Sequence, residues 1–399
     1  MPTADVIIVG GGVIGLSTAY HLAKKGAGKI VLLEKGPVGD GSSSRAAGIT
    51  SGLLWSETGA KARLIGARLF RELSDELGNY TYHNEHGCLN VCNPQQWEGM
   101  QPLLPMYDRN GVPYEVLDAE EIRKRWPALT PADDLIGIHD PNGGYSEPPD
   151  YVAALANRIR ELGVDIREGE QVVDFQIDGG RLTGVQTQSD LFAADKIVCT
   201  VHAWGSKLLE RVGWPVPVKY FVHQRYVTTP VSSSLDWPPI NANAQDAYVR
   251  PAHGNRILVG TSSPDREEFQ VKSLDFHMSE LSAPTSLRDD AAARLSQLVP
   301  QLTDVTWESE RVGLLGFSLD QEPILGPVEP LPGLYVGASF HSGGFSYNPV
   351  AGMLLAECVN DAHTSIDISR FSPNRFVPDE VQAHLATTLR QDQMEQRRH

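Results

Sequence analysis

The segment 5–34 constrains the fold more than any other part of the chain. It begins with the β-branched run DVIIV, which is typical of a strand buried on both faces of a parallel sheet. The glycine motif GGGVIG follows at once, and a helical pattern then leads to a second apolar strand, KIVLL, and to Glu34. Strand, glycines, helix, strand and acid in this order predict a Rossmann-like unit that binds an adenine dinucleotide.

Each element of this unit has a predicted task in physical terms. Gly10 permits a tight turn, Gly12 lets a pyrophosphate approach the helix N-terminus, and Gly15 lets helix and strand pack closely. Glu34 would accept hydrogen bonds from ribose hydroxyls, and an acid there argues against a 2′-phosphate. The predicted cofactor-binding residues of this unit are Gly10, Gly12, Val13, Ile14, Gly15, Glu34 and Lys35.

A second loop of small residues, GPVGDGSSSRAAGIT, follows at 36–50. In an NAD-binding fold, another strand–helix unit normally comes next. Small residues let backbone amides approach an anion, and the serines and Arg45 add donors and charge. We therefore expect the loop to hold the far side of a longer cofactor, which favours FAD; a flexible linker with a solvated Arg45 is the alternative. The predicted contacts are Ser42, Ser43, Arg45, Ala46, Ala47 and Gly48.

These motifs resemble the D-amino acid oxidase superfamily of FAD-dependent amine oxidoreductases, and within it the sarcosine oxidase, dimethylglycine dehydrogenase and glycine oxidase group. The resemblance continues through LDQEPILGP and GLYVGASFHSGGFSYNPVAGMLLAE and covers the range 4–376. It implies an α/β fold in which a Rossmann-like FAD-binding domain is interleaved with an α+β substrate domain built on an antiparallel sheet.

The predicted FAD-binding domain is discontinuous. The segment 216–319 is rich in Tyr and Thr with alternating patterning, which is typical of an antiparallel sheet forming one wall of a cavity. We assign 1–82, 145–215 and 320–370 to the FAD-binding domain, 83–144 and 216–319 to the substrate domain, and 371–399 to a C-terminal tail.

A third cofactor element is predicted near the C-terminus. A strand at 333–338 leads into the loop SFHSGGFSYN and a helix that has Pro349 near its start. The helix N-terminus would point at the flavin and stabilise its reduced, anionic ring. The predicted contacts here are Gly343, Gly344, Phe345 and Ser346. The resemblance also implies that the backbone of Val172 or Val173 faces the adenine.

The chain departs from its relatives at several positions. His202 stands where the family usually has a glycine; it could touch the flavin, or be a hydrogen-bonded structural histidine. The family's flavin-linking cysteine is missing from RVGLLGFSLD, and Arg45 stands at its flavin-linking histidine, so we expect non-covalent FAD. The family's carboxylate anchors are also missing, because Leu315 and Ser346 stand at those positions.

A substrate carboxylate would still need a fork-like cation in a dry pocket. Arg250 is the first candidate and Arg225 the second, with a structural ion pair as the alternative for each. Tyr226, Tyr248, Tyr347 and His341 are candidates to line the cavity, and His341 is the best placed to contact substrate or flavin. The predicted catalytic residues are His341, Arg250, Tyr248 and Tyr347.

The resemblance implies oxidation of a C–N bond in a small amine or amino acid substrate, by hydride transfer to flavin N5 and hydrolysis of the imine. A secondary or tertiary amine, such as an N-methyl or cyclic amino acid, is favoured. One alternative is a 2-hydroxy-acid dehydrogenase with His341 or His202 as base; another is a catalytic subunit of a heteromeric amine dehydrogenase. Oxygen or an electron carrier would accept the electrons, and Arg266 or Lys272 could supply a charge that favours oxygen.

Bulk composition excludes several other classes. The net charge of −16 argues against nucleic acid and anionic membranes as partners. The sequence has no apolar stretch of membrane-spanning length and no signal peptide in MPTAD. Four cysteines give no disulfide framework, so a cytoplasmic protein is expected. Cys88 and Cys92 lack a second ligand pair, so we expect buried thiols and no metal; an oligomer is compatible with the sequence.

Overall fold

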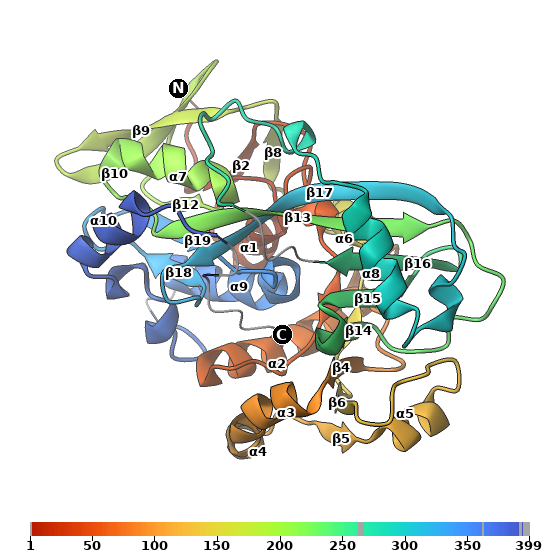
Figure 1. The fold of residues 1–399 in the computed structure, drawn as a ribbon. Coiled ribbons are helices and arrows are strands. Elements are labelled where there is room, and N and C mark those ends of the chain that lie inside the picture. Colours follow the sequence, from red (N-terminus) through yellow and green to blue (C-terminus); the bar gives the residue numbers. More distant parts are fainter. Residues whose placement is uncertain (1, 262–266, 361–362, 391–392, 394–399) are drawn as a thin grey trace.

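The computed structural model describes residues 2–261, 267–360, 363–390 and 393. Within these residues the strands form a six-stranded sheet, an eight-stranded sheet and two smaller sheets. Figure 1 shows the six-stranded sheet and its helices on one side of the molecule and the eight-stranded sheet on the other. The predicted combination of a parallel α/β unit with an antiparallel sheet is confirmed.

The six-stranded sheet is parallel except at one edge. Its order is β18-β19-β12-β1-β2-β8, and β18 alone runs antiparallel to its neighbour. Ile8 of the central strand lies opposite Leu32 on one side and Val198 on the other, and every residue of that strand is buried. Such burial on both faces explains the continuous apolar run. The strands are β1 (Val6–Val9), β2 (Ile30–Glu34), β8 (Asp165–Glu168), β12 (Ile197–Cys199), β18 (Ile324–Pro327) and β19 (Leu334–Ala338).

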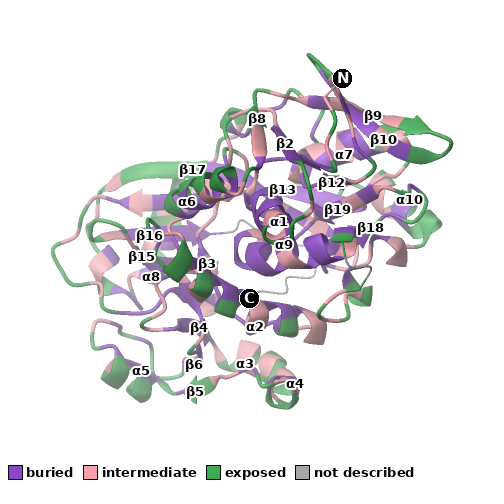
Figure 2. Cartoon of the chain, turned by 180° about the vertical axis from the view of Figure 1, so that it is seen from behind, coloured by how far each residue is buried: buried purple, intermediate pink, exposed green. Residues whose placement is uncertain are grey.

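The helices beside this sheet form the main apolar core. Helix α1 packs against α9 and α6, and α2 packs against α9. A Cβ on Gly352 would lie 2.4 Å from the hydroxyl of Ser17, so the glycine lets α1 and α9 approach closely. Figure 2 shows both helices as largely buried. The four helices are α1 (Val13–Lys24), α2 (Glu57–Glu76), α6 (Pro148–Glu161) and α9 (Gly344–Asn360).

Helix α9 begins earlier than the sequence predicted. It starts at Gly344, so Pro349 lies inside the helix and not near its start. A proline there has no N–H for the carbonyl four residues before it. The side-chain amide of Asn348 donates to that carbonyl, on Phe345, at 2.6 Å, and the Asn348 oxygen accepts from the Tyr151 hydroxyl at 2.6 Å. A side chain therefore replaces the missing backbone donor.

The eight-stranded sheet joins two segments that are distant in sequence. Its order is β17-β13-β16-β15-β14-β4-β6-β5, and all neighbours are antiparallel except β14 and β4. Helix α8 packs on β16 and β15. The strands are β4 (Cys88–Cys92), β5 (Glu115–Leu117), β6 (Ile136–Asp140), β13 (Val218–Thr228), β14 (Ile240–Ala242), β15 (Ala247–Ala252), β16 (Arg256–Thr261) and β17 (Trp307–Ser318). The associated helices are α3 (Pro94–Met100), α4 (Leu104–Asn110), α5 (Ala119–Arg125) and α8 (Ser286–Leu295).

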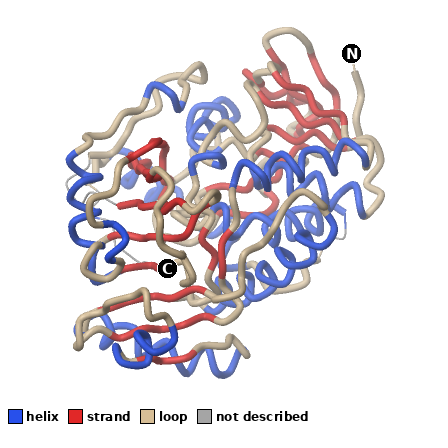
Figure 3. The backbone as a smooth tube through the Cα atoms, turned by 90° about the vertical axis from the view of Figure 1, so that its right-hand side faces the viewer, coloured by secondary structure: helices blue, strands red, loops and turns tan. Residues whose placement is uncertain are grey.

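The remaining elements lie at the periphery. Figure 3 shows the N-terminus beside a group of strands, where Thr3 pairs with Ala193. The C-terminal segment is anchored, because the buried ammonium of Lys219 donates to the carbonyl of Thr387 at 2.6 Å while pairing with Glu268 at 2.9 Å. These elements are β3 (Ile49–Thr50), β7 (Gly144–Tyr145), β9 (Val172–Asp178), β10 (Arg181–Thr187), β11 (Leu191–Ala193), α7 (Gly205–Leu208) and α10 (Pro378–Ala386).

The close contact between β1 and α1 allows a prediction about stability. A Cβ on Gly15 would lie 2.0 Å from the carbonyl oxygen of Gly10, so Gly15→Ala forces the helix away from the strand. We expect the free energy of unfolding of the apoprotein to fall by about 2 kcal/mol or more, in line with overpacked interiors. The control Gly99→Ala, where a Cβ meets nothing within 4 Å in helix α3, should keep stability the same or raise it slightly in denaturant titrations, because alanine favours a helix. Equal stability of the two variants would contradict the close packing.

Candidate active site

A cavity of about 350 Å³ runs from the carboxyl ends of the parallel strands to the face of the eight-stranded sheet. Its lining includes the last residues of β1, β2 and β19 and the residue after β12, which is where open parallel sheets bind ligands. It continues along the second loop to the segment after β19 and to strands β15 and β17. One continuous cavity therefore connects all three predicted cofactor elements.

The glycine turn leaves its backbone open to the cavity. Gly10 has a φ of +106°, a conformation that favours glycine, and the Thr200 hydroxyl is 3.1 Å from the carbonyls of Val9 and Gly10. The Glu34 carboxylate accepts from the amides of Gly11 at 2.7 Å and Gly36 at 2.9 Å. Burial raises the pKa of Glu34, although these two hydrogen bonds oppose the rise.

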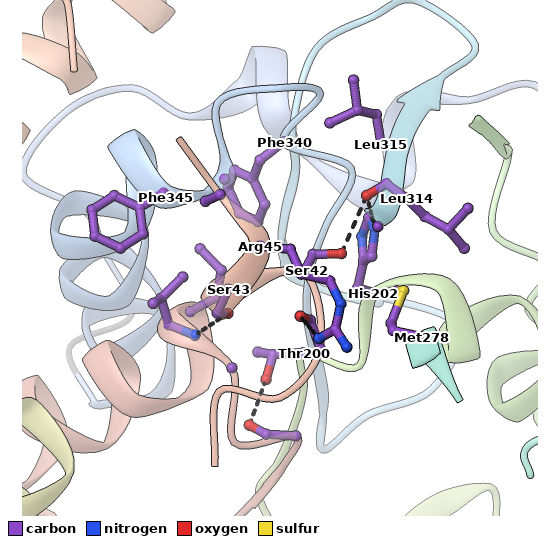
Figure 4. Close-up of a pocket in the computed structure, with 18 of the residues that line it drawn as sticks. Ser42, Ser43, Arg45, Thr200, His202, Met278, Leu314, Leu315, Phe340 and Phe345 are labelled. Atoms are coloured by element: carbon purple, nitrogen blue, oxygen red, sulfur yellow. Dashed lines mark hydrogen bonds between the residues drawn. The ribbon is translucent and has the colours of Figure 1, made fainter. Parts of the chain in front are cut away.

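The second loop is held in place and is no flexible linker. The Ser43 hydroxyl accepts from the amide of Val13 at 3.0 Å, and the Ser42 hydroxyl donates to the carbonyl of Leu314 at 3.2 Å (Figure 4). The guanidinium of Arg45 donates to the carbonyls of Asp40 and Gly41. The Arg45 side chain is 11% exposed, so it braces its own loop and is not the solvated charge of the alternative interpretation.

Two buried arginines hold the outer side of this loop. Arg225 donates to the carbonyls of Ser44 at 2.9 Å and Arg45 at 3.1 Å, and Arg250 donates to that of Ala47 at 2.5 Å. The strand register places both arginines on the face of the sheet that carries Tyr248. Neither arginine lines the cavity.

The prediction that Arg250 is a catalytic residue that anchors a carboxylate is wrong. Its side chain is fully buried and forms a two-point ion pair with Glu147, at 2.8 Å and 3.0 Å. The same guanidinium also donates to the carbonyl of Pro251. With its donors occupied, Arg250 is a structural residue, as the alternative interpretation proposed.

His202 occupies a backbone conformation that suits the glycine usual in the family. Its φ is +43°, in the left-handed region where glycine is unstrained. Its Nε2 lies 3.1 Å from the Leu314 carbonyl (Figure 4), and burial lowers its pKa to about 4. Because a carbonyl only accepts, Nε2 carries the proton of a neutral ring. Nε2 therefore cannot act as a base, although the ring does line the cavity.

The aromatic candidates divide between the cavity and the core. His341 lines the cavity, with its ring 5.7 Å from that of Trp55 and 5.2 Å from that of Phe317. Tyr248 also lines it, and its hydroxyl lies 3.0 Å from Nε2 of His223.

Tyr226 and Tyr347, also predicted as candidates, are not among the residues that line the cavity. Tyr226 follows Arg225 on β13 and therefore faces the opposite side of the sheet, against Trp307. Tyr347 lies on the face of α9 that packs against α2.

Most of the predicted cofactor residues lie together on the cavity wall. Those on it are Gly10, Gly12, Val13, Ile14, Glu34, Lys35, Ser42, Ser43, Arg45, Ala46, Ala47, Gly48, Val172, His202, Gly343, Gly344 and Phe345. Three are elsewhere: Gly15 packs on Gly10, Ser346 is buried, and Val173 lies in a separate surface hollow with Lys272. Arg266 lies outside the described residues.

Arg63 is a lining residue that the sequence analysis missed. It lies on α2, is 3% exposed, and faces the cavity beside Ser51 and Gly343. Burial lowers its pKa. The signal in the sequence was a lone arginine among small residues in the first half of the buried helix face, namely Gly59, Ala60, Ala62, Gly66 and Ala67.

The residues present fit an FAD molecule. A Cβ on Gly12 would lie 3.2 Å from the Ser43 hydroxyl, so a side chain there would fill the space between turn and loop. Glu34 offers a half-buried acceptor, and Lys35 is fixed by two carbonyls, each at 2.8 Å. The glycine turn and Glu34 would hold the adenosine and pyrophosphate part, and the segment 341–345 would lie along the flavin part.

Comparison with known proteins defines the class. The family model described as FAD dependent oxidoreductase matches residues 5–358, so the chain belongs to this family. The predicted family, fold class, enzyme class and FAD cofactor are thereby confirmed. The lining contains no cysteine among the described residues, and all four thiols are free and lie elsewhere, so FAD is held without a cysteinyl bond.

Individual relatives are more distant. The chain is 26% identical to 4-methylaminobutanoate oxidase (formaldehyde-forming) of Paenarthrobacter nicotinovorans, over 94% of this chain but 46% of that protein. It is 28% identical to glycine oxidase of Geobacillus kaustophilus (94% and 97% covered) and to sarcosine oxidase subunit beta of Arthrobacter sp (93% and 91%). Its fold matches L-proline dehydrogenase from P. horikoshii with a TM-score of 0.86 at 21% identity, covering 94% and 98% of the chains.

The described part of the chain holds neither a metal centre nor a membrane span. No group of three or more His, Cys, Asp or Glu side chains is arranged to hold a metal ion there. Among the helices of that part, none combines the length and apolar character of a membrane span. Cys88 and Cys92 lie on β4 with buried thiols, whose pKa values burial raises.

Glu34 generates a prediction about cofactor affinity. Glu34→Gln removes the charge that would accept a ribose hydroxyl, so the Kd for FAD should rise about 10- to 100-fold, the value of a hydrogen bond to a charged group. Because burial raises the Glu34 pKa, wild-type affinity should also fall as the pH drops through that raised pKa, whereas the variant should stay flat. Flavin fluorescence titrations of the apoprotein from pH 8 to pH 5 measure both. Equal affinity of the two proteins at pH 8 would contradict the assignment.

Arg250 generates a prediction about stability. Arg250→Met leaves the partly buried Glu147 carboxylate, which is 18% exposed, without its partner, and this should cost about 3 kcal/mol of unfolding free energy, the low end for a buried pair. Adding Glu147→Gln should recover part of this loss, as denaturant titrations would show. Because Arg250 is no substrate ligand, the preference for carboxylated over uncarboxylated substrates should persist in the double variant. Loss of that preference would restore Arg250 as an anchor.

Proposed function

We propose that the protein oxidises the C–N bond of a small secondary or tertiary amine or amino acid, with FAD as the oxidant. The observation that carries this proposal is the single cavity that joins the glycine turn to a wall formed by Tyr248, Phe317 and His341. The names of the relatives support it, since they describe oxidation of methylated or primary amino acids.

The chemistry needs little from the side chains. When bound, FAD supplies a two-electron acceptor for the hydride leaving the carbon next to nitrogen, and water then hydrolyses the resulting imine to a carbonyl compound and an amine. The chain's task is to orient a neutral amine, exclude bulk water and hold the substrate's polar groups. Phe317 and His341 on the cavity wall, whose rings lie 5.2 Å apart, provide an aromatic surface for this purpose.

The two candidate reactions differ in their need for a base. An alcohol must lose its hydroxyl proton to a base, whereas a neutral amine needs no such group. Nε2 of His202 is engaged with the Leu314 carbonyl, so His202 could act as a base only through Nδ1, and His341 is the other predicted base at the cavity wall.

The electron acceptor, the assembly and the compartment are further parts of the proposal. Oxygen or an electron carrier would reoxidise the flavin, and the relative named as a subunit keeps a heteromeric or oligomeric assembly as an alternative. The four free cysteines favour a reducing compartment such as the cytoplasm.

Anaerobic flavin reduction tests the proposal. The purified holoprotein is mixed with N-methyl amino acids, proline, primary amino acids and 2-hydroxy acids. The visible absorbance of the oxidised flavin is then followed. We expect bleaching by an N-methylated or cyclic amine, and the matching carbonyl product or cyclic imine in the mixture. Bleaching by a hydroxy acid alone would replace the proposal with the alcohol reaction. His341→Ala separates the two, because only the alcohol reaction should lose flavin reduction.

A further inference from the structure

Arg63 is a buried cation at the cavity wall whose bonding is incomplete. Its side chain is 3% exposed, and its hydrogen bond from Nη1 to the Ser51 carbonyl is long, at 3.4 Å. The guanidinium lies over the ring of Tyr347, with its centre 4.3 Å from the ring centroid, and Nε has no hydrogen-bond partner. A buried guanidinium left in this state is costly unless something else completes its bonding.

Within the described residues, no carboxylate lies within ion-pair distance of Arg63, unlike the other buried cations Lys219 and Arg250. The nearby carboxylate, Asp140, is engaged elsewhere: it accepts from the amides of Gly52 at 2.6 Å and Asn142 at 2.9 Å. Asp140 therefore contributes long-range attraction to Arg63 but no direct bond. Ion pairing is left for a group that enters the cavity.

The position of Arg63 is defined by the segment that follows β19. A Cβ on Gly343 would lie 2.3 Å from Nη2 of Arg63, so only glycine lets the guanidinium reach the wall there. One turn further along α2, a Cβ on Gly66 would lie 3.5 Å from the carbonyl of Ser346, so the two segments pack closely. Arg63 thus brings a positive charge from α2 to the part of the cavity wall beside Gly343.

We propose that Arg63 binds the carboxylate of the substrate, which makes the substrate class amino acids or N-substituted amino acids and not simple amines. This inference rests on the proposed function. A planar guanidinium matches a carboxylate in a two-point hydrogen-bonded pair, and the pair is strongest where water is excluded. Tyr347 positions the guanidinium through its ring face and hydroxyl.

The test separates carboxylate binding from oxidation. The holoprotein is titrated with acetate, propanoate and 2-furoate, and with the corresponding amides, while the visible spectrum of bound FAD reports binding. We expect wild-type protein to bind the acids and not the amides. Arg63→Met should raise the Kd for the acids at least about 100-fold, the equivalent of two charged hydrogen bonds. Arg63→Lys, which keeps the charge but not the fork, should give an intermediate Kd and guards against a Met variant that does not fold.

The control is Arg68→Met, which removes a charge from the same helix at an exposed position paired with Glu72. It should bind the acids as wild type does. Unchanged carboxylate affinity in Arg63→Met, or no carboxylate binding by the wild type, would overturn the inference. A parallel turnover assay compares N-methylglycine with dimethylamine, and proline with pyrrolidine. If none of these amines reduces the flavin, the proposed function fails. That result is distinct from a failed carboxylate titration, which would contradict only the role of Arg63.

Discussion

The shape of the cavity depends on hydrogen bonds from two buried arginines, Arg225 and Arg250, to backbone carbonyls of the small-residue loop 36–50. Carbonyl oxygens facing a phosphate would repel it, and this loop has to present donors to the cofactor. Arg225 and Arg250 take the carbonyls of Ser44, Arg45 and Ala47, and Glu147 fixes Arg250 in turn. The eight-stranded sheet thereby shapes a loop that belongs in sequence to the Rossmann-like unit. These contacts tie the loop to the strands that also carry Tyr248.

The same hydrogen bonds and ion pairs also decide which buried cation is left to bind a substrate. Buried cations are stable only when hydrogen-bonded or paired, and Lys219, Arg225 and Arg250 all have such partners within the fold. Arg63 faces the cavity without a carboxylate at ion-pair distance among the described residues. The same physical rule that makes Arg250 structural is the reason why we propose Arg63 as the residue that recognises a substrate carboxylate.

Sequence reasoning succeeded where the signal is local. The glycine turn, the acid after β2 and the buried strands follow from short patterns whose meaning is set by backbone geometry, and the structure places them at one cavity. It failed where the outcome depends on distant partners. Arg250 could not be assigned without knowing that Glu147 would meet it, and Tyr226 could not be excluded without knowing which face of β13 meets the cavity. Arg63 was missed because its role depends on how α2 is rotated against α9.

The cavity defines a site in which this chain holds one FAD without a covalent bond. This can be measured by precipitating the purified holoprotein with acid and by quantifying and identifying the flavin in the supernatant. We expect one FAD per chain, all of it released. Flavin that stays with the precipitated protein would contradict the non-covalent site, and a protein that takes up no flavin on reconstitution would contradict the site itself.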